Sequence, residues 1–220
     1  MLFAGAIAIV VIESFLLGSI PWGVIISRLV KHDDVRTHGS GNIGTTNMIR
    51  AYGKKLGYIC FVLDFAKAAL ACLIAVALTG LFVDAGWISV AFAESNLMGM
   101  TAGLSAVLGH IFSPWLGFKG GKGVACGTGV AVVVFGFVPL LILLAVFIAF
   151  TATVRAVSAG SIAAAVVFPF LGLWVFWGNV PGIVMSFIIG IVVVWSHRSN
   201  IQRLANGTEN KFGSKKVAEK

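Results

Sequence analysis

Long apolar stretches alternate with short polar connections along the whole chain of 220 residues. Most of these stretches approach the ~20 residues that an α-helix needs to cross the hydrocarbon core of a bilayer. The pattern therefore predicts an all-α, polytopic integral membrane protein. We place seven transmembrane helices, at residues 2–27, 57–80, 98–113, 123–137, 139–154, 161–177 and 181–196.

The stretch from Val124 to Thr153 decides the number of spans. A single helix of this length would run roughly 45 Å, well beyond a hydrocarbon core of about 30 Å. The segment FGFVP, at 135–139, offers a glycine and a proline where a tight turn can form. We therefore predict two short helices here rather than one long helix.

Charged residues are distributed unevenly between the two ends of the predicted bundle. Loop 81–97 contains Asp84 and Glu94 but no Lys or Arg. Lys and Arg gather instead in the connections that would alternate on the other side, namely 28–56, 114–122, 155–160 and the tail from 197. Because positively charged loops favour the cytoplasm, we predict an outside N-terminus and a cytoplasmic C-terminus. A single span over 124–153 would scatter this charge over both faces.

The composition supports a membrane protein without a soluble domain. Hydrophobic residues make up 59% of the chain and charged residues 11%, against about 25% charged residues in a typical soluble domain. We expect one membrane domain over residues 1–205 and a basic cytoplasmic tail over 206–220. The net charge of +8 lies in the loops, a distribution that does not favour nucleic-acid binding.

Four polar stretches rich in glycine or serine fall on the predicted cytoplasmic side. They are HGSGNIGTTNMIR (38–50), GFKGGKG (117–123), SAGS (158–161) and SHRSN (196–200). Glycine-rich backbone exposes N–H groups that can form an anion-binding nest. Side chains suited to phosphate accompany it: Ser40, Thr45, Thr46, Arg50, Lys119, Lys122, Ser158 and Ser161. We expect the four stretches to converge on a pocket with room for more than one phosphate.

Each of these motifs alone is more typical of a turn or a topology signal, and only their coincidence favours a site. His197 and Asn200 lie three residues apart and would share a helix face, where His197 could orient or deprotonate a hydroxyl or simply contact lipid head groups. His110 is better explained as a structural hydrogen bonder that fixes the 117–123 loop. Asp64 and Lys67, inside the second span, are either an internal pair or a functional one. No set of residues has the spacing of a metal site.

Several motifs together resemble those of a known family. GSIPWG (18–23), the segment 39–57, GHIFSPWLGFKGGKGVA (109–125), SAGS and HRSN (197–200) are similar, in order, to the signatures of acyl-phosphate-dependent glycerol-3-phosphate acyltransferases of bacterial membranes. The resemblance covers roughly residues 5–212. It implies seven transmembrane helices, an outside N-terminus and a site on the cytoplasmic side of the bacterial inner membrane, the arrangement that the charges indicate independently.

The resemblance also implies an activity. That family transfers a fatty acyl group from acyl phosphate to the sn-1 hydroxyl of glycerol 3-phosphate, which gives lysophosphatidic acid and inorganic phosphate in the first acylation of phospholipid synthesis. It implies no cofactor, and an enzyme that generates acyl phosphate as a partner. The H-x-x-x-x-D motif of other glycerolipid acyltransferases is absent here, because none of the four histidines has an aspartate five residues on.

Roles carry over by position. The resemblance implies three catalytic residues, Ser40, His197 and Asn200. It implies a glycerol 3-phosphate site made by Arg50, Lys122, Ser158 and Ser161. It implies an acyl-phosphate site made by Gly41, Asn42, Gly44, Thr46, Asn47, Lys119, Gly120 and Gly121. Pro114 and Cys126 depart from the usual pattern, but neither is assigned a catalytic role.

The alternative function is a transporter or flippase for a phosphorylated, lipid-like substrate. The same anion-binding loops and apolar bundle would serve such a protein. However, a transporter typically shows internal repeats and a binding site at the bilayer midplane. The polar stretches gather on one side here and the sequence shows no inverted repeat, so we favour the acyltransferase.

Overall fold

The computed structural model describes residues 1–211, and in this part of the chain every regular element is helical and no strand occurs. The all-α prediction is therefore confirmed. The α-helices are α1 (Leu2–Ser19), α2 (Trp22–Lys31), α3 (Thr45–Tyr52), α4 (Lys54–Asp84), α5 (Val90–Glu94), α6 (Leu97–Ile111), α7 (Val124–Val130), α8 (Phe137–Val154), α9 (Val157–Val175), α10 (Val180–Ser196) and α11 (Arg198–Ala205). Short 3-10 segments, η1 (Val35–Thr37) and η2 (Pro114–Leu116), and a π-helical segment, η3 (Ala131–Phe135), complete them.

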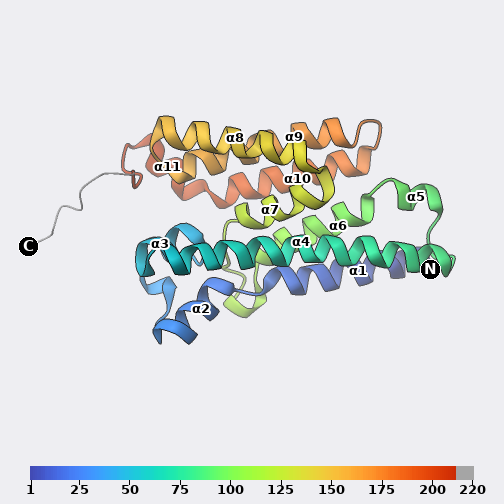
Figure 1. Cartoon of the computed structure of the whole chain (residues 1–220), viewed down its shortest axis with the longest axis horizontal. Coiled ribbons are helices and arrows are strands. Elements are labelled where there is room, and N and C mark those ends of the chain that lie inside the picture. Colours follow the sequence, from blue (N-terminus) through green and yellow to red (C-terminus); the bar gives the residue numbers. More distant parts are fainter. Residues whose placement is uncertain (212–220) are drawn as a thin grey trace, which may run out of the picture.

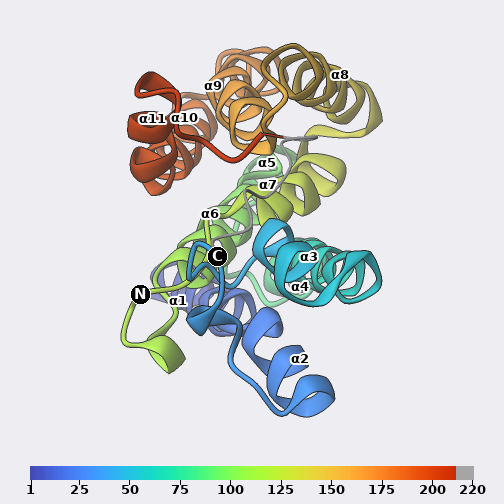
Figure 2. The ribbon, with the colours of Figure 1, turned by 90° about the vertical axis from the view of Figure 1, so that its left-hand side faces the viewer.

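The helices form two layers with α6 and α7 between them (Figures 1 and 2). One layer contains α8, α9, α10 and α11, and the other contains α1, α2, α3 and α4. Helix α6 packs against α1 and α4 on one side and against α10 on the other. The approach of α1 and α6 depends on glycine, because a Cβ at Gly18 would lie 2.2 Å from the Ala106 carbonyl oxygen. Small residues at helix interfaces are typical of membrane bundles.

Helix α8 shows how the bundle meets lipid. Only Pro139 and Leu143 are buried along its 18 residues, and the remaining large apolar side chains are mostly exposed. Such a surface would be unfavourable in water but is favourable against hydrocarbon. The outward-facing surface of α8 is therefore suited to contact with the lipid hydrocarbon.

The helices match most of the predicted spans. Within residues 1–211, five helical segments are long and apolar enough to cross a membrane, and α10 with α11, bent by 56°, would make a sixth. The predicted break in 135–139 is confirmed, because the chain turns at Gly136. However, Val124–Phe135 would rise only roughly 18 Å, too short to cross about 30 Å of hydrocarbon. The count of seven spans therefore stays a prediction.

Two predicted boundaries are wrong, and one predicted span is interrupted. The span predicted at 2–27 corresponds to Leu2–Lys31, which is long and apolar enough to cross a membrane, but it is interrupted at Ile20 and Pro21 because proline has no N–H to continue the helical hydrogen bonding. The connection 28–56 is not only loop, because it contains α3 and the end of α2. Helix α9 begins at Val157 rather than 161, so the SAGS stretch forms its first turn.

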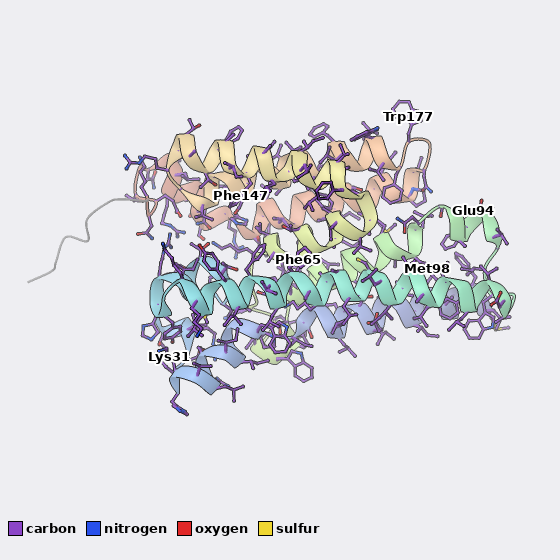
Figure 3. All side chains as sticks on the ribbon, viewed as in Figure 1. Lys31, Phe65, Glu94, Met98, Phe147 and Trp177 are labelled. Atoms are coloured by element: carbon purple, nitrogen blue, oxygen red, sulfur yellow. The ribbon has the colours of Figure 1, made fainter. Side chains whose placement is uncertain are left out.

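The charges separate between the two ends of the molecule. Figure 3 shows Lys31 at the end where α3 and α11 lie, and Glu94 and Trp177 at the opposite end. This distribution agrees with the predicted segregation of basic loops. Which end faces the cytoplasm stays a prediction.

Candidate functional site

A cavity of about 540 Å³ lies where the four polar stretches meet. Its polar lining includes Ser40, Arg50, Lys122, Ser158 and His197, so the expected convergence is confirmed. The rest of its wall comes from apolar side chains of α8, α9 and α10, among them Leu140, Leu144, Phe147, Phe168 and Ile189. Phe147 is labelled on α8 in Figure 3. The site thus combines cations and hydroxyls with a compartment suited to a hydrocarbon chain.

The loop before α3 is held together by one amide side chain. Asn47 is 2% exposed, and its Nδ2 donates to the carbonyl oxygens of Val35, His38 and Asn42 at 2.8–3.1 Å. Its Oδ1 accepts from the Ser40 N–H at 3.0 Å. Asn47, predicted as a substrate ligand, therefore has its amide fully engaged in positioning Ser40 and the loop.

The expected nest of free N–H donors is not formed by the glycines. In the loop before α3, the N–H groups of Gly41 and Gly44 donate to the His38 carbonyl and to Asn42 Oδ1, both at 2.9 Å. The N–H groups of Gly120 and Gly121 donate to the carbonyls of Ile111 and His110. The glycines instead permit close approach, since a Cβ at Gly120 would lie 2.0 Å from the His110 carbonyl oxygen.

A second, polar cavity of about 330 Å³ adjoins the first. The two cavities share Ser40, Asn42 and Lys122. The second adds six cationic or glycine positions at its wall: Gly41, Lys119, Gly120, Gly121, Arg198 and Arg203. The predicted acyl-phosphate residues are therefore divided. Asn42, Gly44, Thr46 and Asn47 line the first cavity, whereas Gly41, Asn42, Lys119, Gly120 and Gly121 line the second.

His197 is held as a neutral imidazole with one free acceptor. Burial lowers the pKa of His197 to about 4, so the ring is uncharged at neutral pH. Its Nδ1 lies 2.8 Å from the Val193 carbonyl oxygen, which can only accept, so Nδ1 carries the proton. Nε2 is then the unprotonated nitrogen, able to accept a hydrogen bond from a substrate hydroxyl.

A chain of polar contacts joins Lys122 to the C-terminal segment. Lys122 Nζ donates to Asn200 Oδ1, and Asn200 Nδ2 donates to Glu209 Oε1 at 3.0 Å. Burial, and then the positive charge of Arg203, lowers the pKa of Lys122 to about 8. Asn200, predicted as catalytic, therefore orients Lys122 through its oxygen, and any contact of Asn200 with substrate stays a prediction.

Glu209 is the site residue that sequence reasoning missed. It is 7% exposed, and its carboxylate accepts from Ser158 Oγ at 3.0 Å and from Arg203 Nε at 2.8 Å. Burial would raise the pKa of Glu209, but the hydrogen bonds from its three partners outweigh it and the pKa is lowered. The signal was the Asn206–Gly207 pair, a turn sequence. Gly207 has φ +70°, and the turn directs residues 208–211 back towards the cavity. The sequence predicts instead that these residues belong to a tail that extends away from the helices.

Two predicted hydroxyls remain available for ligands. Within residues 1–211, neither Ser40 Oγ nor Ser161 Oγ makes a hydrogen bond to protein, although both residues line the first cavity. Ser158, by contrast, is committed to Glu209. Of the two predicted serines of α9, Ser161 is therefore the one with a free hydroxyl.

Below these residues, the predicted intramembrane pair is confirmed. Lys67 Nζ lies 2.8 Å from Asp64 Oδ1, and both side chains are only 2% exposed. His110 Nδ1 lies 3.0 Å from Lys67 Nζ, and the bond to the loop comes from the backbone, because the His110 carbonyl accepts from the Gly121 N–H at 3.0 Å. A role of the His110 side chain in fixing this loop stays a prediction. Asp64 and His110 also belong to the cavity wall.

Comparison with known proteins identifies the family. A family model described as glycerol-3-phosphate acyltransferase matches residues 8–207. The protein of that name from Syntrophotalea carbinolica is 41% identical, and the match covers 93% of this chain and 96% of that protein. The one from Maricaulis maris is 39% identical, and the match covers 92% of this chain and 85% of that protein. The crystal structure of PlsY, an integral membrane glycerol 3-phosphate acyltransferase, in its glycerol 3-phosphate form is 38% identical with a TM-score of 0.80, and the match covers 94% of this chain and 96% of that one. Its lysophosphatidic acid form is 36% identical with a TM-score of 0.77, covering 94% and 95%. This chain belongs to the glycerol-3-phosphate acyltransferase family of integral membrane proteins.

Proposed function

We propose that this protein transfers a fatty acyl group from acyl phosphate to the sn-1 hydroxyl of glycerol 3-phosphate. The products would be lysophosphatidic acid and inorganic phosphate. The observation that carries the proposal is the composition of one cavity wall, which unites Arg50, Lys122 and neutral His197 with an apolar compartment between α8, α9 and α10. The cations of this wall are complementary to a phosphorylated polyol, and its apolar compartment is complementary to a long acyl chain.

Glycerol 3-phosphate would bind through its phosphate. Arg50 offers a planar guanidinium and Lys122 an ammonium, and the Ser161 hydroxyl adds a neutral donor. With the phosphate fixed, the sn-1 hydroxyl would reach His197 Nε2, whose lone pair accepts its proton in a hydrogen bond. Ser40 would orient the same alcohol from the loop before α3.

The acyl donor would lie with its chain among the apolar side chains and its phosphate towards the cations. Thr45 and Thr46 offer the amide groups of the first turn of α3, which the helix itself does not use. The hydroxyl oxygen forms a bond to the acyl carbon, and the bond between that carbon and the phosphate oxygen breaks. The hydroxyl proton, held in the hydrogen bond to His197 Nε2, is passed on to the released phosphate, so His197 ends the reaction neutral. Because acyl phosphate is already activated, positioning and electrostatics suffice.

The site would lie on the cytoplasmic side of the bacterial inner membrane, because loops rich in Lys and Arg favour that side. An enzyme that generates acyl phosphate would be the natural partner, since this donor must be delivered to the inner leaflet. No observation favours the transporter. Apart from Asp64, His110 and Thr128, the polar residues of the two cavities come from the connections and helix ends at one end of the bundle.

The test is transfer by the purified protein with palmitoyl phosphate and glycerol 3-phosphate in the absence of CoA. We expect equal amounts of lysophosphatidic acid and inorganic phosphate. Palmitoyl-CoA in place of the acyl phosphate should give no product. Glu94→Gln, at the opposite end, is the matched control and should behave as the wild type. Transfer from palmitoyl-CoA alone would overturn the proposed donor.

A further inference from the structure

Three ionisable side chains form a buried cluster beneath the site. Asp64, Lys67 and His110 are 1%, 3% and 4% exposed. Lys67 Nζ is surrounded by three acceptors, the Ile20 carbonyl oxygen at 2.6 Å, Asp64 Oδ1 at 2.8 Å and His110 Nδ1 at 3.0 Å. The function described above uses none of these three side chains.

The ammonium group determines which nitrogen of His110 carries the proton. An ammonium has N–H donors and no acceptor, and it donates here to the Ile20 carbonyl oxygen and lies against Asp64 as an ion pair. His110 Nδ1 is nearer to this ammonium, at 3.0 Å, than to Asp64 Oδ1, at 3.6 Å, which favours Nδ1 as the acceptor and a proton on Nε2. Lys67 therefore makes His110 Nε2–H a hydrogen-bond donor, whereas His197 Nε2 is an acceptor.

The free nitrogen of His110 faces Gly121 in the loop at 119–122. A Cβ at Gly121 would lie 2.0 Å from Nε2, so the ring is pressed against the backbone of this loop. Among the described residues no atom accepts a hydrogen bond from Nε2, although His110 is a wall residue of the first cavity. Since His110 belongs to the wall of the cavity, a ligand oxygen there would give Nε2–H an acceptor.

The position of His110 suggests which oxygen it meets. On the inner side of this loop the neighbours are apolar, since a Cβ at Gly123 would contact Val107 and Val193 at 3.2 Å. The cations Arg50 and Lys122 line the same cavity as His110 and the apolar side chains. The acyl carbonyl of a bound donor lies between its chain and its phosphate, so an arrangement in which it meets His110 is consistent with this shared wall.

We propose that His110 is a catalytic residue whose Nε2–H donates a hydrogen bond to the carbonyl oxygen of the acyl donor. The proposal rests on the proposed acyl transfer. As the hydroxyl oxygen bonds to the acyl carbon, the carbonyl oxygen gains negative charge, and Nε2–H stabilises it without giving up its proton. When the carbon–phosphate oxygen bond breaks, the carbonyl re-forms. Lys67 and Asp64 are positioning residues that fix the imidazole in the donating form.

The experiment compares His110→Gln with His110→Phe in the CoA-free assay. Glutamine can place an N–H near the position of Nε2, whereas phenylalanine fills the space without a donor. Loss of one such donor typically lowers kcat by about 100- to 1,000-fold, and we expect this for His110→Phe with the glycerol 3-phosphate KM within about threefold. We expect His110→Gln to stay within about tenfold of the wild type.

Nitrogen NMR of ¹⁵N-histidine-labelled wild-type protein provides a second readout that does not depend on a variant folding. His110→Gln assigns the signal, which should show a protonated Nε2 and an unprotonated Nδ1. A non-reactive acyl phosphonate should shift it. An Nδ1-protonated neutral ring, or kcat of His110→Phe within twofold of wild type, would overturn the role of His110. Failure of the wild type to use acyl phosphate would instead overturn the proposed donor.

Discussion

Ser158 and Glu209 lie 51 residues apart in the sequence, and the Ser158 hydroxyl donates a hydrogen bond of 3.0 Å to the Glu209 carboxylate. The same carboxylate accepts from Asn200 and Arg203. The first turn of α9, helix α11 and the segment after it are therefore tied together at the cavity wall. Since Asn200 also orients Lys122, these contacts extend to the cation that we propose binds phosphate.

Removal of the Glu209 charge should impair the site. In Glu209→Gln an amide N–H₂ replaces one carboxylate oxygen and meets the donors of Arg203 or Asn200, so Lys122 loses its fixed orientation. Hydrogen bonds to charged groups contribute about 1.5–3 kcal/mol, so we expect kcat/KM for glycerol 3-phosphate to fall about 10- to 100-fold. Steady-state kinetics measures this, with Glu94→Gln as the control. Equal kcat/KM in both variants would contradict the positioning role.

Arg50 should act mainly through binding. Its guanidinium lines the cavity without contacting the reacting carbonyl in the proposed arrangement. We expect Arg50→Ala to raise the glycerol 3-phosphate KM at least about tenfold, because a charge-assisted phosphate contact is lost, and to change kcat by less than about threefold. Arg28→Ala is the control, since Arg28 pairs with Asp34 outside the cavity. An unchanged KM for Arg50→Ala would show that the phosphate binds elsewhere.

The pH dependence of kcat/KM should have two limits set by Lys122 and His197. The pKa of Lys122 is about 8, so the ammonium that we propose binds phosphate is lost as the pH rises through this value. The pKa of His197 is about 4, so its acceptor nitrogen is lost only as the pH falls towards 4. We expect a decline above about pH 8 that approaches tenfold per pH unit, and the acidic decline near pH 4.

Lys122→Arg tests the alkaline limit. A guanidinium stays protonated throughout this range, so the decline above pH 8 should disappear even if the maximal rate is lower. Retention of the same alkaline decline in this variant would assign it to another group.

Periodicity and charge were sufficient to predict the helical architecture, the break at Gly136 and the convergence of the polar stretches. Local geometry was not predictable from the same pattern. A glycine-rich loop looks the same in sequence whether its N–H groups are free or, as for Gly120 and Gly121, bonded to nearby carbonyls. Pro21 lies in an apolar run, which concealed the interruption between α1 and α2. The Asn206–Gly207 pair indicates a turn, but the contribution of Glu209 depends on a tertiary contact with Ser158 that the turn sequence does not specify.

Transfer should proceed without an acylated serine. Activation of a serine nucleophile requires an adjacent base, and within the described residues Ser40 Oγ has no hydrogen-bond partner. We expect intact-protein mass spectrometry to show no acyl adduct after mixing with palmitoyl phosphate alone. Ser40→Ala should lower kcat about tenfold through lost orientation of the alcohol rather than abolish transfer. An acyl group on a peptide that contains Ser40 would refute direct attack.

The orientation of the bundle can be measured with a membrane-impermeant maleimide. Lys31 and Glu94 lie at opposite ends and are exposed, and the three native cysteines are all buried, so background labelling should be low. In right-side-out vesicles we expect Glu94→Cys to react and Lys31→Cys to be protected, because the basic end should face the cytoplasm. Inverted vesicles should exchange the two results, which controls for the reactivity of each position. Labelling of Lys31→Cys in right-side-out vesicles would place the cavity on the outer side, where acyl phosphate is not delivered.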